Sequence, residues 1–345
     1  MSEDIPHPRE VISFEGGDGV ERAFLDALER GRLHHAWLLV GPEGIGKATF
    51  AYRAARRLLG AAADPSLGLL GSPPGDPVCR QIMARAHPDL LVLQRDAEDG
   101  KTRKGIPVDD ARALPEFFAK TPAASPYRVA IIDAADDLNE SAANAVLKTL
   151  EEPPERGVVF LVSHAPGSLL PTLRSRCRKL KFQPPSEEAA VTWVAVKSGA
   201  REDDARRLLA MARGAPGRAW RLAAEGALDL DRTARDLLAS LPRTDDVAMA
   251  ALAEGFRGAA GAPRFDLLMD RLAGRVSDMA SASALTGEEE GGGQAGTLDA
   301  WAEAWELLVD LPRAAEAVNL DRADVFFTVL SRLRAVTQNV GDADR

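Results

Sequence analysis

A glycine-rich stretch carries the first residues whose types and spacing suggest chemistry. Residues 41–49 have the sequence GPEGIGKAT. In the pattern G-x-x-x-x-G-K-[ST], backbone N–H groups converge on phosphate oxygens, the lysine reaches the outer phosphates, and the next hydroxyl binds Mg²⁺. That hydroxyl position holds Ala48 here. The stretch therefore predicts a nucleotide-phosphate loop that lacks its magnesium ligand and is formed by Gly41, Gly44, Gly46 and Lys47.

The second part of such a site is an apolar strand that ends in Asp and is often followed by Glu. Residues 129–133, VAIID, supply the strand and end in Asp133, but position 134 is alanine. The Asp would hold Mg²⁺ through water, and the Glu would polarise the attacking water. The hydroxyl at 48 and the carboxylate at 134 are absent together, which favours a site that does not hydrolyse nucleotide. The retained glycines and lysine still allow ATP or ADP to be held idle.

Two neighbours of the lost groups, Thr49 and Asp136, are candidates to replace them. Thr49 is a poor substitute, because one step along a helix rotates a side chain by about 100°. On the sequence alone, Asp136 remains a candidate to replace the missing carboxylate at position 134.

A third group of residues is basic. Residues 168–178 have the sequence SLLPTLRSRCR and are followed by two further lysines. The planar guanidinium stabilises transferring phosphate well, and an arginine from a neighbouring subunit can raise the rate by orders of magnitude. On the residues alone, the favoured interpretation is a solvated basic face that comprises Arg174, Arg176, Arg178, Lys179 and Lys181.

The elements that must position these residues are strands and helices in alternation. Continuous apolar runs favour strands buried on both faces of a parallel sheet. They occur at 37–40, 90–93, 129–132, 158–162 and 179–182. Helices are predicted at 49–59, after the glycine loop, and at 139–150, before Pro153. The sequence thus predicts an α/β doubly wound domain that ends near Phe182.

Beyond residue 185 the sequence changes to alanine-, leucine- and arginine-rich helical patterns without strand-like runs. A Gly/Glu segment at 286–293 predicts a mobile loop between helices. We therefore expect three parts. They are a P-loop domain over 1–184, a small helical lid domain over 185–242 and a C-terminal helical bundle, or collar, over 243–345.

The bulk composition narrows the class of protein and its environment. The 345 residues are 46% hydrophobic and 28% charged, as in an ordinary globular protein, and a net charge of −9 argues against a free-standing nucleic-acid binder. No apolar run is long enough to span a bilayer, and the N-terminus does not resemble a signal peptide. The two cysteines, Cys79 and Cys177, suggest a reducing compartment. We expect a cytoplasmic protein with no membrane partner.

Two runs of sequence resemble the clamp-loader subunits of the AAA+ superfamily. They are LKTLEEPP at 147–154 and TLRSRC at 172–177, and the resemblance extends over about residues 33–182. In the motor subunits of this family the lysine of the loop is followed by Thr or Ser, and the strand aspartate by Glu. This chain departs at both positions, as the non-hydrolysing subunits do. The resemblance also places Gly217 where motor subunits carry an arginine that touches the γ-phosphate.

The resemblance implies a role for Arg176 as an arginine finger that points into the ATP site of an adjacent motor subunit. Arg174 and Arg178 keep the interpretation of a basic face. It also implies a non-hydrolysing stator in a hetero-oligomeric clamp loader, which helps place a sliding clamp on primed DNA within a DNA polymerase holoenzyme. The expected partners are the motor and delta subunits, the sliding clamp and, through the complex, primed DNA. The chain is then not catalytic alone and requires no cofactor.

Members of this family often carry a four-cysteine zinc module before the second strand. Only Cys79 stands in that region, and one thiolate cannot make a tetrahedral site, so we expect no zinc and no metal site. Three alternatives remain open. They are an ATP-hydrolysing motor subunit of the same assembly, a P-loop small-molecule kinase, and a plain DNA-binding protein.

Overall fold

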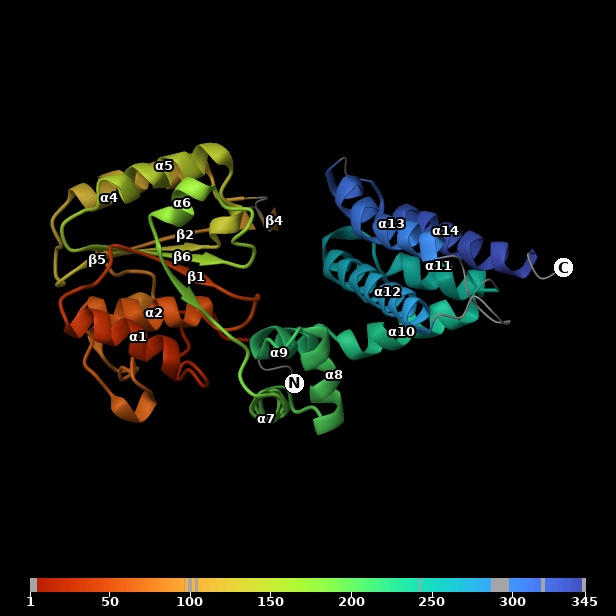
Figure 1. Ribbon diagram of the computed structural model, residues 1–345, viewed down its shortest axis with the longest axis horizontal. Coiled ribbons are helices and arrows are strands. Elements are labelled where there is room, and N and C mark those ends of the chain that lie inside the picture. Colours follow the sequence, from red (N-terminus) through yellow and green to blue (C-terminus); the bar gives the residue numbers. More distant parts are fainter. Residues whose placement is uncertain are drawn as a thin grey trace. The chain divides into compact units, whose positions relative to one another are not determined.

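The predicted apolar runs form one five-stranded parallel sheet in the computed structural model (Figure 1). The structure describes residues 5–95, 97–98, 101–102, 105–241, 243–286, 298–317 and 320–342. The strand order is β2-β5-β6-β1-β7. The strands are β1 (Ala36–Val40), β2 (Leu90–Gln94), β5 (Arg128–Asp133), β6 (Gly157–Ser163) and β7 (Arg178–Lys181). The five strand predictions and the parallel α/β fold class are therefore confirmed.

Both faces of the sheet are covered by helices, which explains why the strands are apolar on both sides. Figure 1 shows α1 (Asp18–Glu29) and α2 (Lys47–Leu58) on one face, and α4 (Val108–Ala119), α5 (Glu140–Glu151) and α6 (Pro171–Ser175) on the other. Alternate residues of one strand enter different cores. Trp37 and Leu39 pack with the α1 and α2 side chains, and Leu38 packs with those of α4 and α5.

Helices α2 and α5 confirm the two helices predicted next to the sheet, with small shifts at their ends. The predicted start of the first helix at 49 was late, because α2 begins at Lys47 directly after the loop. Asn139 caps α5 by accepting a hydrogen bond from the backbone N–H of Ala142. Further helices of this unit, α1, α3 (Pro77–Met83) and α4, were not predicted. A short antiparallel pair, β3 (Ala97–Glu98) and β4 (Lys101–Thr102), follows β2.

Three helices follow the sheet. They are α7 (Glu187–Ser198), α8 (Glu202–Met211) and α9 (Pro216–Ala224), and the indole rings of Trp193 and Trp220 pack edge to face between α7 and α9 at 5.7 Å. The predicted helical character after residue 185 is confirmed. The start of α9 lies next to the glycine loop, because the N–H of Gly217 bonds to the carbonyl of Gly44. We call α7, α8 and α9 the lid.

The chain divides into two compact units, Met1–Arg221 and Leu222–Arg345. The described secondary structure of the second unit is all helical and comprises α10 (Ala227–Ser240), α11 (Asp246–Glu254), α12 (Gly258–Thr286), α13 (Leu298–Ala317) and α14 (Arg322–Asp342). Its core includes an aromatic cluster of Phe256, Phe265 and Phe326. The division into three parts at residues 184 and 242 stays a prediction. The predicted Gly/Glu loop lies, from Gly287 onward, outside the described residues. No helix among the described residues is long and apolar enough to span a membrane.

Candidate functional site: a phosphate loop and a distant arginine

The glycine-rich stretch forms the turn between β1 and α2, where the sequence places it. Gly46 caps α2 in the left-handed conformation, with φ of 96°. A side chain on Gly44, whose φ is 76°, would collide with the backbone of Arg218 at 2.3 Å. Glycine is therefore required at both positions, at Gly46 by conformation and at Gly44 also by the close approach of the lid.

Lys47 is buried, and its ammonium group is turned onto the loop itself. The Nζ atom donates hydrogen bonds to the carbonyl oxygens of Gly41 and Pro42, both at 2.6 Å. Burial lowers the pKa of Lys47 to about 8, against the attraction of Asp133, Asp136 and Glu43. The group that should reach a phosphate is thus satisfied by the backbone of its own loop.

Asp133 lies at the carboxyl end of β5, on the same edge of the sheet as the phosphate loop. The register pairs Asp133 with Val162 on β6, and Ser163 pairs with Val40 on β1. Burial raises the pKa of Asp133 to about 6, although the charge of Lys47 opposes this change. The structure therefore brings together Lys47 and Asp133, as predicted, with Ala134 directly after the aspartate.

Asp136, the one neighbour left open as a rescue, is fully engaged in structural hydrogen bonds. Its carboxylate accepts from the Ser163 hydroxyl at 2.8 Å and from the backbone N–H groups of His164 and Ala165 at 2.6 and 3.3 Å. These bonds fix the turn after β6. A carboxylate held in this way is a poor general base for a water molecule, so the structure offers no support for a rescue by Asp136.

The lid closes directly on the loop through backbone and ionic contacts that the sequence did not reveal. The N–H of Gly217 donates to the carbonyl of Gly44 at 2.9 Å. Arg221 binds the Glu43 carboxylate at 2.8 Å, and Arg218 approaches it at 3.7 Å. Burial raises the pKa of Glu43, but Arg221, His164 and Arg218 together lower it below its usual range. Lid arginines therefore pair with the loop's own glutamate.

An aromatic residue from the N-terminal arm also covers the loop. A Cβ atom on Gly46 would lie 2.3 Å from the ring of Phe14, so the ring rests against the loop backbone. The arm is held to α2 by two buried arginines. Arg53 donates to the carbonyl of Ile12, and Arg56 donates to that of Val11 at 2.8 Å. The sequence carried no pattern that predicted this role of Phe14.

Arg176 lies near the amino ends of the strands, whereas the phosphate loop follows the carboxyl end of β1. Strand β7 begins two residues later, and its first residue pairs with Trp37 near the amino end of β1. The loop follows the carboxyl end of β1, and a five-residue strand spans about 15 Å. Arg176 Nη2 binds Glu151 Oε1 at 2.8 Å, and Nη1 donates to the carbonyl of Thr172 at 3.0 Å. The structure thus does not bring Arg176 to Lys47 and Asp133.

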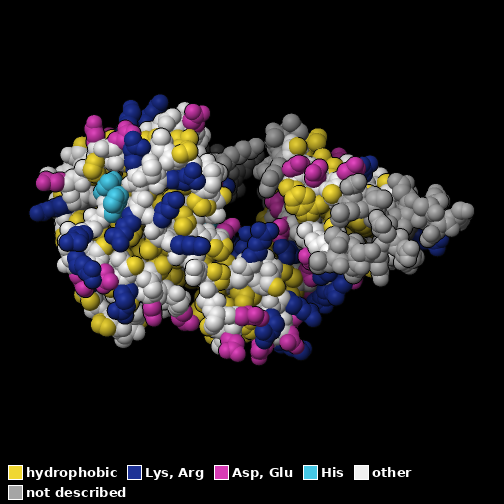
Figure 2. Space-filling view, in the orientation of Figure 1, with side chains coloured by type: hydrophobic (Ala, Val, Ile, Leu, Met, Phe, Trp, Pro, Cys, Tyr) yellow, Lys and Arg dark blue, Asp and Glu magenta, His cyan; other side chains and the backbone are white. Residues whose placement is uncertain are grey.

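The other basic residues of this segment have local partners or face outward. Arg174 donates to the carbonyl of Pro166 at 3.2 Å, and the guanidinium of Arg178 lies 4.9 Å from the centre of the Trp37 ring. Lys179 and Lys181 are exposed on β7. Figure 2 shows Lys and Arg side chains spread over the visible face of the first unit, among apolar and acidic ones. These contacts agree with a basic face for the residues other than Arg176.

The residues considered for metal binding do not gather. Cys79 is buried on α3, and burial raises the pKa of its thiol. Cys177 is also a free thiol, and burial raises its pKa to about 12. Within the part of the chain that the structure describes, no group of three or more His, Cys, Asp or Glu side chains is arranged to hold a metal ion.

The fold and site define a class of protein. A parallel sheet in this strand order, a phosphate loop after β1 and a helical lid after the last strand make the first unit an AAA+ P-loop domain. Within that class, residues 18–186 match a family model described as "DNA polymerase III, delta subunit".

Curated relatives agree with this match. The chain is 36% identical over 193 residues to DNA polymerase III subunit delta' of Pseudomonas aeruginosa. The aligned residues make up 56% of each chain. It is 36% identical over 194 residues to subunit delta' of Escherichia coli, again 56% of each. Subunit gamma of Buchnera aphidicola is 36% identical over 182 residues, 52% of this chain and 46% of that protein.

Residues 18–186 are therefore similar to the DNA polymerase III delta subunit family, and the relatives support the resemblance to clamp-loader subunits. The match spans 56% of the length of the two delta' relatives. Because delta' and gamma subunits match at the same identity, the choice between a stator and a motor rests on the residues of the site.

Proposed function

We propose that this chain is a non-hydrolysing subunit of a DNA polymerase III clamp loader. In this role it helps place a sliding clamp on primed DNA during replication in the cytoplasm. Its partners are the motor and delta subunits, the clamp, and DNA through the complex. The chain is not an enzyme by itself. It contributes rigidity and one arginine, Arg176, to the ATP site of a neighbouring motor subunit.

The observation that carries the proposal is the state of Lys47. Its ammonium group is 2.6 Å from two carbonyl oxygens of the loop, and the next residue has no hydroxyl to bind Mg²⁺. The lid backbone touches Gly44, and Phe14 rests on Gly46. To reach a phosphate, the ammonium group of Lys47 would have to leave the carbonyl oxygens of Gly41 and Pro42. We therefore derive no hydrolytic step at this loop, although idle binding of ATP or ADP stays a separate proposal.

The location of Arg176 supports a role in trans. It stands at the edge of the sheet opposite to the chain's own phosphate loop, with 36% of its side chain exposed. An arginine in this place has no phosphate of its own chain to stabilise. A neighbouring subunit that packs its nucleotide site against this edge would receive it, and the planar fork of donors suits a transferring phosphate.

The helical second unit supports hetero-oligomer formation. Trp305 on α13 and Phe327 on α14 expose 42% and 41% of their surface. Aromatic side chains are enriched in the buried centres of protein interfaces. We propose that this unit packs against the corresponding helices of the other subunits.

Purified chain tests the proposal against the motor-subunit alternative. We expect no ATP hydrolysis above background by the chain alone. In a complex reconstituted with motor and delta subunits, Lys47→Ala should leave the ATPase stimulated by clamp and DNA within about twofold of its original rate. Abolition of that ATPase by Lys47→Ala would overturn the stator role. Phosphate transfer to a small-molecule acceptor would instead favour a kinase, and salt-dependent DNA binding by the chain alone would favour a plain DNA-binding protein.

A further inference from the structure

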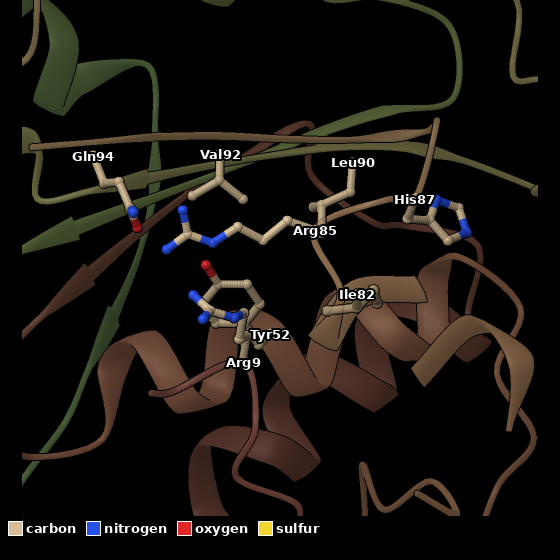
Figure 3. A pocket seen from close by; sticks show the side chains of 8 residues that line it. All are labelled: Arg9, Tyr52, Ile82, Arg85, His87, Leu90, Val92 and Gln94. Atoms are coloured by element: carbon tan, nitrogen blue, oxygen red, sulfur yellow. The ribbon is translucent and has the colours of Figure 1, made fainter. Parts of the chain in front are cut away.

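A small cavity opens under the free edge of the sheet, away from the phosphate loop. Its volume is about 170 Å³, and it lies between the edge strand β2 and the helices α2 and α3 (Figure 3). Ile82, Leu90 and Val92 form its apolar walls. The function proposed above assigns no role to this cavity.

Two arginines bring their guanidinium groups to one end of the cavity. Figure 3 shows the side chain of Arg85 running under β2 toward Gln94, with the guanidinium of Arg9 below it and the Tyr52 hydroxyl between them. His87 lies at the other end of the cavity. The two guanidinium groups and the Tyr52 hydroxyl therefore lie together at one end of a small volume.

Each arginine is placed by the backbone around it. Arg85 has a φ of 55°, in the left-handed region, just after α3, and this bend turns its side chain back under β2. The Nε atom of Arg9 donates to the carbonyl of Met83 at 3.2 Å, and its own carbonyl accepts from Arg56 at 2.5 Å. The two guanidinium groups are thus built into the fold from segments far apart in sequence.

The positive charge at this end of the cavity is only partly balanced. Arg9 Nη2 forms an ion pair with Glu10 at 3.2 Å, but the Glu10 side chain is 43% exposed and therefore screened by water. The buried Nη1 atom of Arg9 has no acceptor, and Arg85 has no ion pair, among the described residues. Burial, and then the charges of Arg9 and Arg85, lowers the pKa of the adjacent His7 to about 4. His7 is consequently neutral near pH 7, and the guanidinium groups supply the charge.

We propose that this cavity binds one phosphate group, as inorganic phosphate or as the phosphate of a small monoester. Two guanidinium groups side by side repel each other, and a dianion between them would turn this repulsion into two charge-assisted contacts. The buried Nη1 donor of Arg9 would then gain its acceptor. The apolar walls formed by Ile82 and Leu90 accommodate the ester substituent.

The dimensions and surroundings favour a small phosphate over a nucleic-acid backbone. The volume of about 170 Å³ holds one phosphate group and a small substituent. A nucleic-acid chain needs a row of cations along its backbone, whereas the two arginines meet at one point.

The test is a calorimetric titration of the full-length chain with inorganic phosphate at low ionic strength. We expect saturable one-to-one binding with a millimolar Kd. Arg85→Gln and Arg9→Gln should each weaken it at least tenfold. The matched control is Arg80→Gln, which removes the same charge from an exposed position on α3 and should keep the affinity.

Three outcomes would overturn the proposal. They are no saturable binding, equal affinity in Arg85→Gln and the original chain, or tighter binding of a single-stranded oligonucleotide that is lost in the same variants. Because Arg85 is exposed on the surface, its substitution is expected to leave the fold intact, which a thermal unfolding curve verifies. Arg85→Gln therefore keeps the test valid even if Arg9→Gln destabilises the N-terminal arm.

Discussion

Arg176 and Glu151 form an ion pair across the ends of α6 and α5, with Nη2 and Oε1 2.8 Å apart. Both residues belong to the two runs that carry the clamp-loader resemblance. The pair is half exposed, so it is worth about 0–1 kcal/mol and opens at little cost. Glu151 therefore holds the arginine at the edge of the sheet without trapping it.

Glu151→Gln is expected to change the ATPase of the reconstituted complex by less than about fivefold, because only this weak pair is lost. The measurement is the steady-state ATPase with clamp and primed DNA. A loss as large as that caused by Arg176→Ala would show that the carboxylate of Glu151 is essential, which the exposed pair does not predict.

Gly217→Ala is expected to destabilise the first unit by roughly 1–3 kcal/mol, because a Cβ atom there would lie 2.7 Å from the carbonyl oxygen of Gly44. Denaturant unfolding measures the change. Gly19→Ala is the matched control, since a Cβ atom at that helical position meets nothing within 4 Å, and this variant should be unchanged or slightly more stable. Equal stability of both variants would contradict the contact between lid and loop.

The raised pKa of Asp133 predicts a pH dependence of stability. Its value rises from 3.8 to about 6 in the folded chain, so the folded state binds more protons between these values, and stability falls as pH rises through that window. Asp133→Asn should remove this slope, which amounts to at most roughly 3 kcal/mol. Lys47 stays charged throughout this window. In Asp133→Asn the loss of its negative neighbour therefore changes the unfolding free energy by the same amount at every pH of the window. Unfolding free energies measured from pH 4 to 6 check the difference, and parallel curves would refute it.

Restoring the missing hydroxyl alone should not create an ATPase. In Ala48→Thr the carboxylate at 134 is still lacking, and Lys47 remains bonded to the carbonyls of Gly41 and Pro42. A coupled assay of phosphate release by the purified variant checks this. Turnover above that of the original chain would mean that the magnesium ligand was the only missing part.

The sheet and the loop were predictable because their causes are local in sequence. Strands buried on both faces need continuous apolar runs, and a phosphate loop needs glycines at fixed spacing, so β1, β5 and the loop at 41–47 follow directly. The absence of two catalytic groups was equally predictable. Ala48 stands where a hydroxyl would bind Mg²⁺, and Ala134 stands where a carboxylate would polarise the attacking water.

The closure of the site was not predictable, because it depends on contacts between distant parts of the chain. Arg221 and Glu43 are 178 residues apart, and the arginine pattern of α9 does not indicate a carboxylate as its partner. Phe14 reaches the loop only because Arg53 and Arg56 hold the arm to α2. The location of Arg176 at the far edge likewise follows from strand order and register, which single residues do not encode.

The central claim, that Arg176 serves a neighbouring subunit's nucleotide, is tested most directly by Arg176→Ala in a reconstituted clamp loader. In this assay the phosphate loops of the other motor subunits are inactivated by substitution. The measured ATPase then comes only from the motor subunit next to this chain. We predict at least a tenfold loss of ATPase stimulated by clamp and DNA, whereas Arg174→Ala stays within about twofold. An unchanged rate in Arg176→Ala, with the complex fully assembled, would contradict the account.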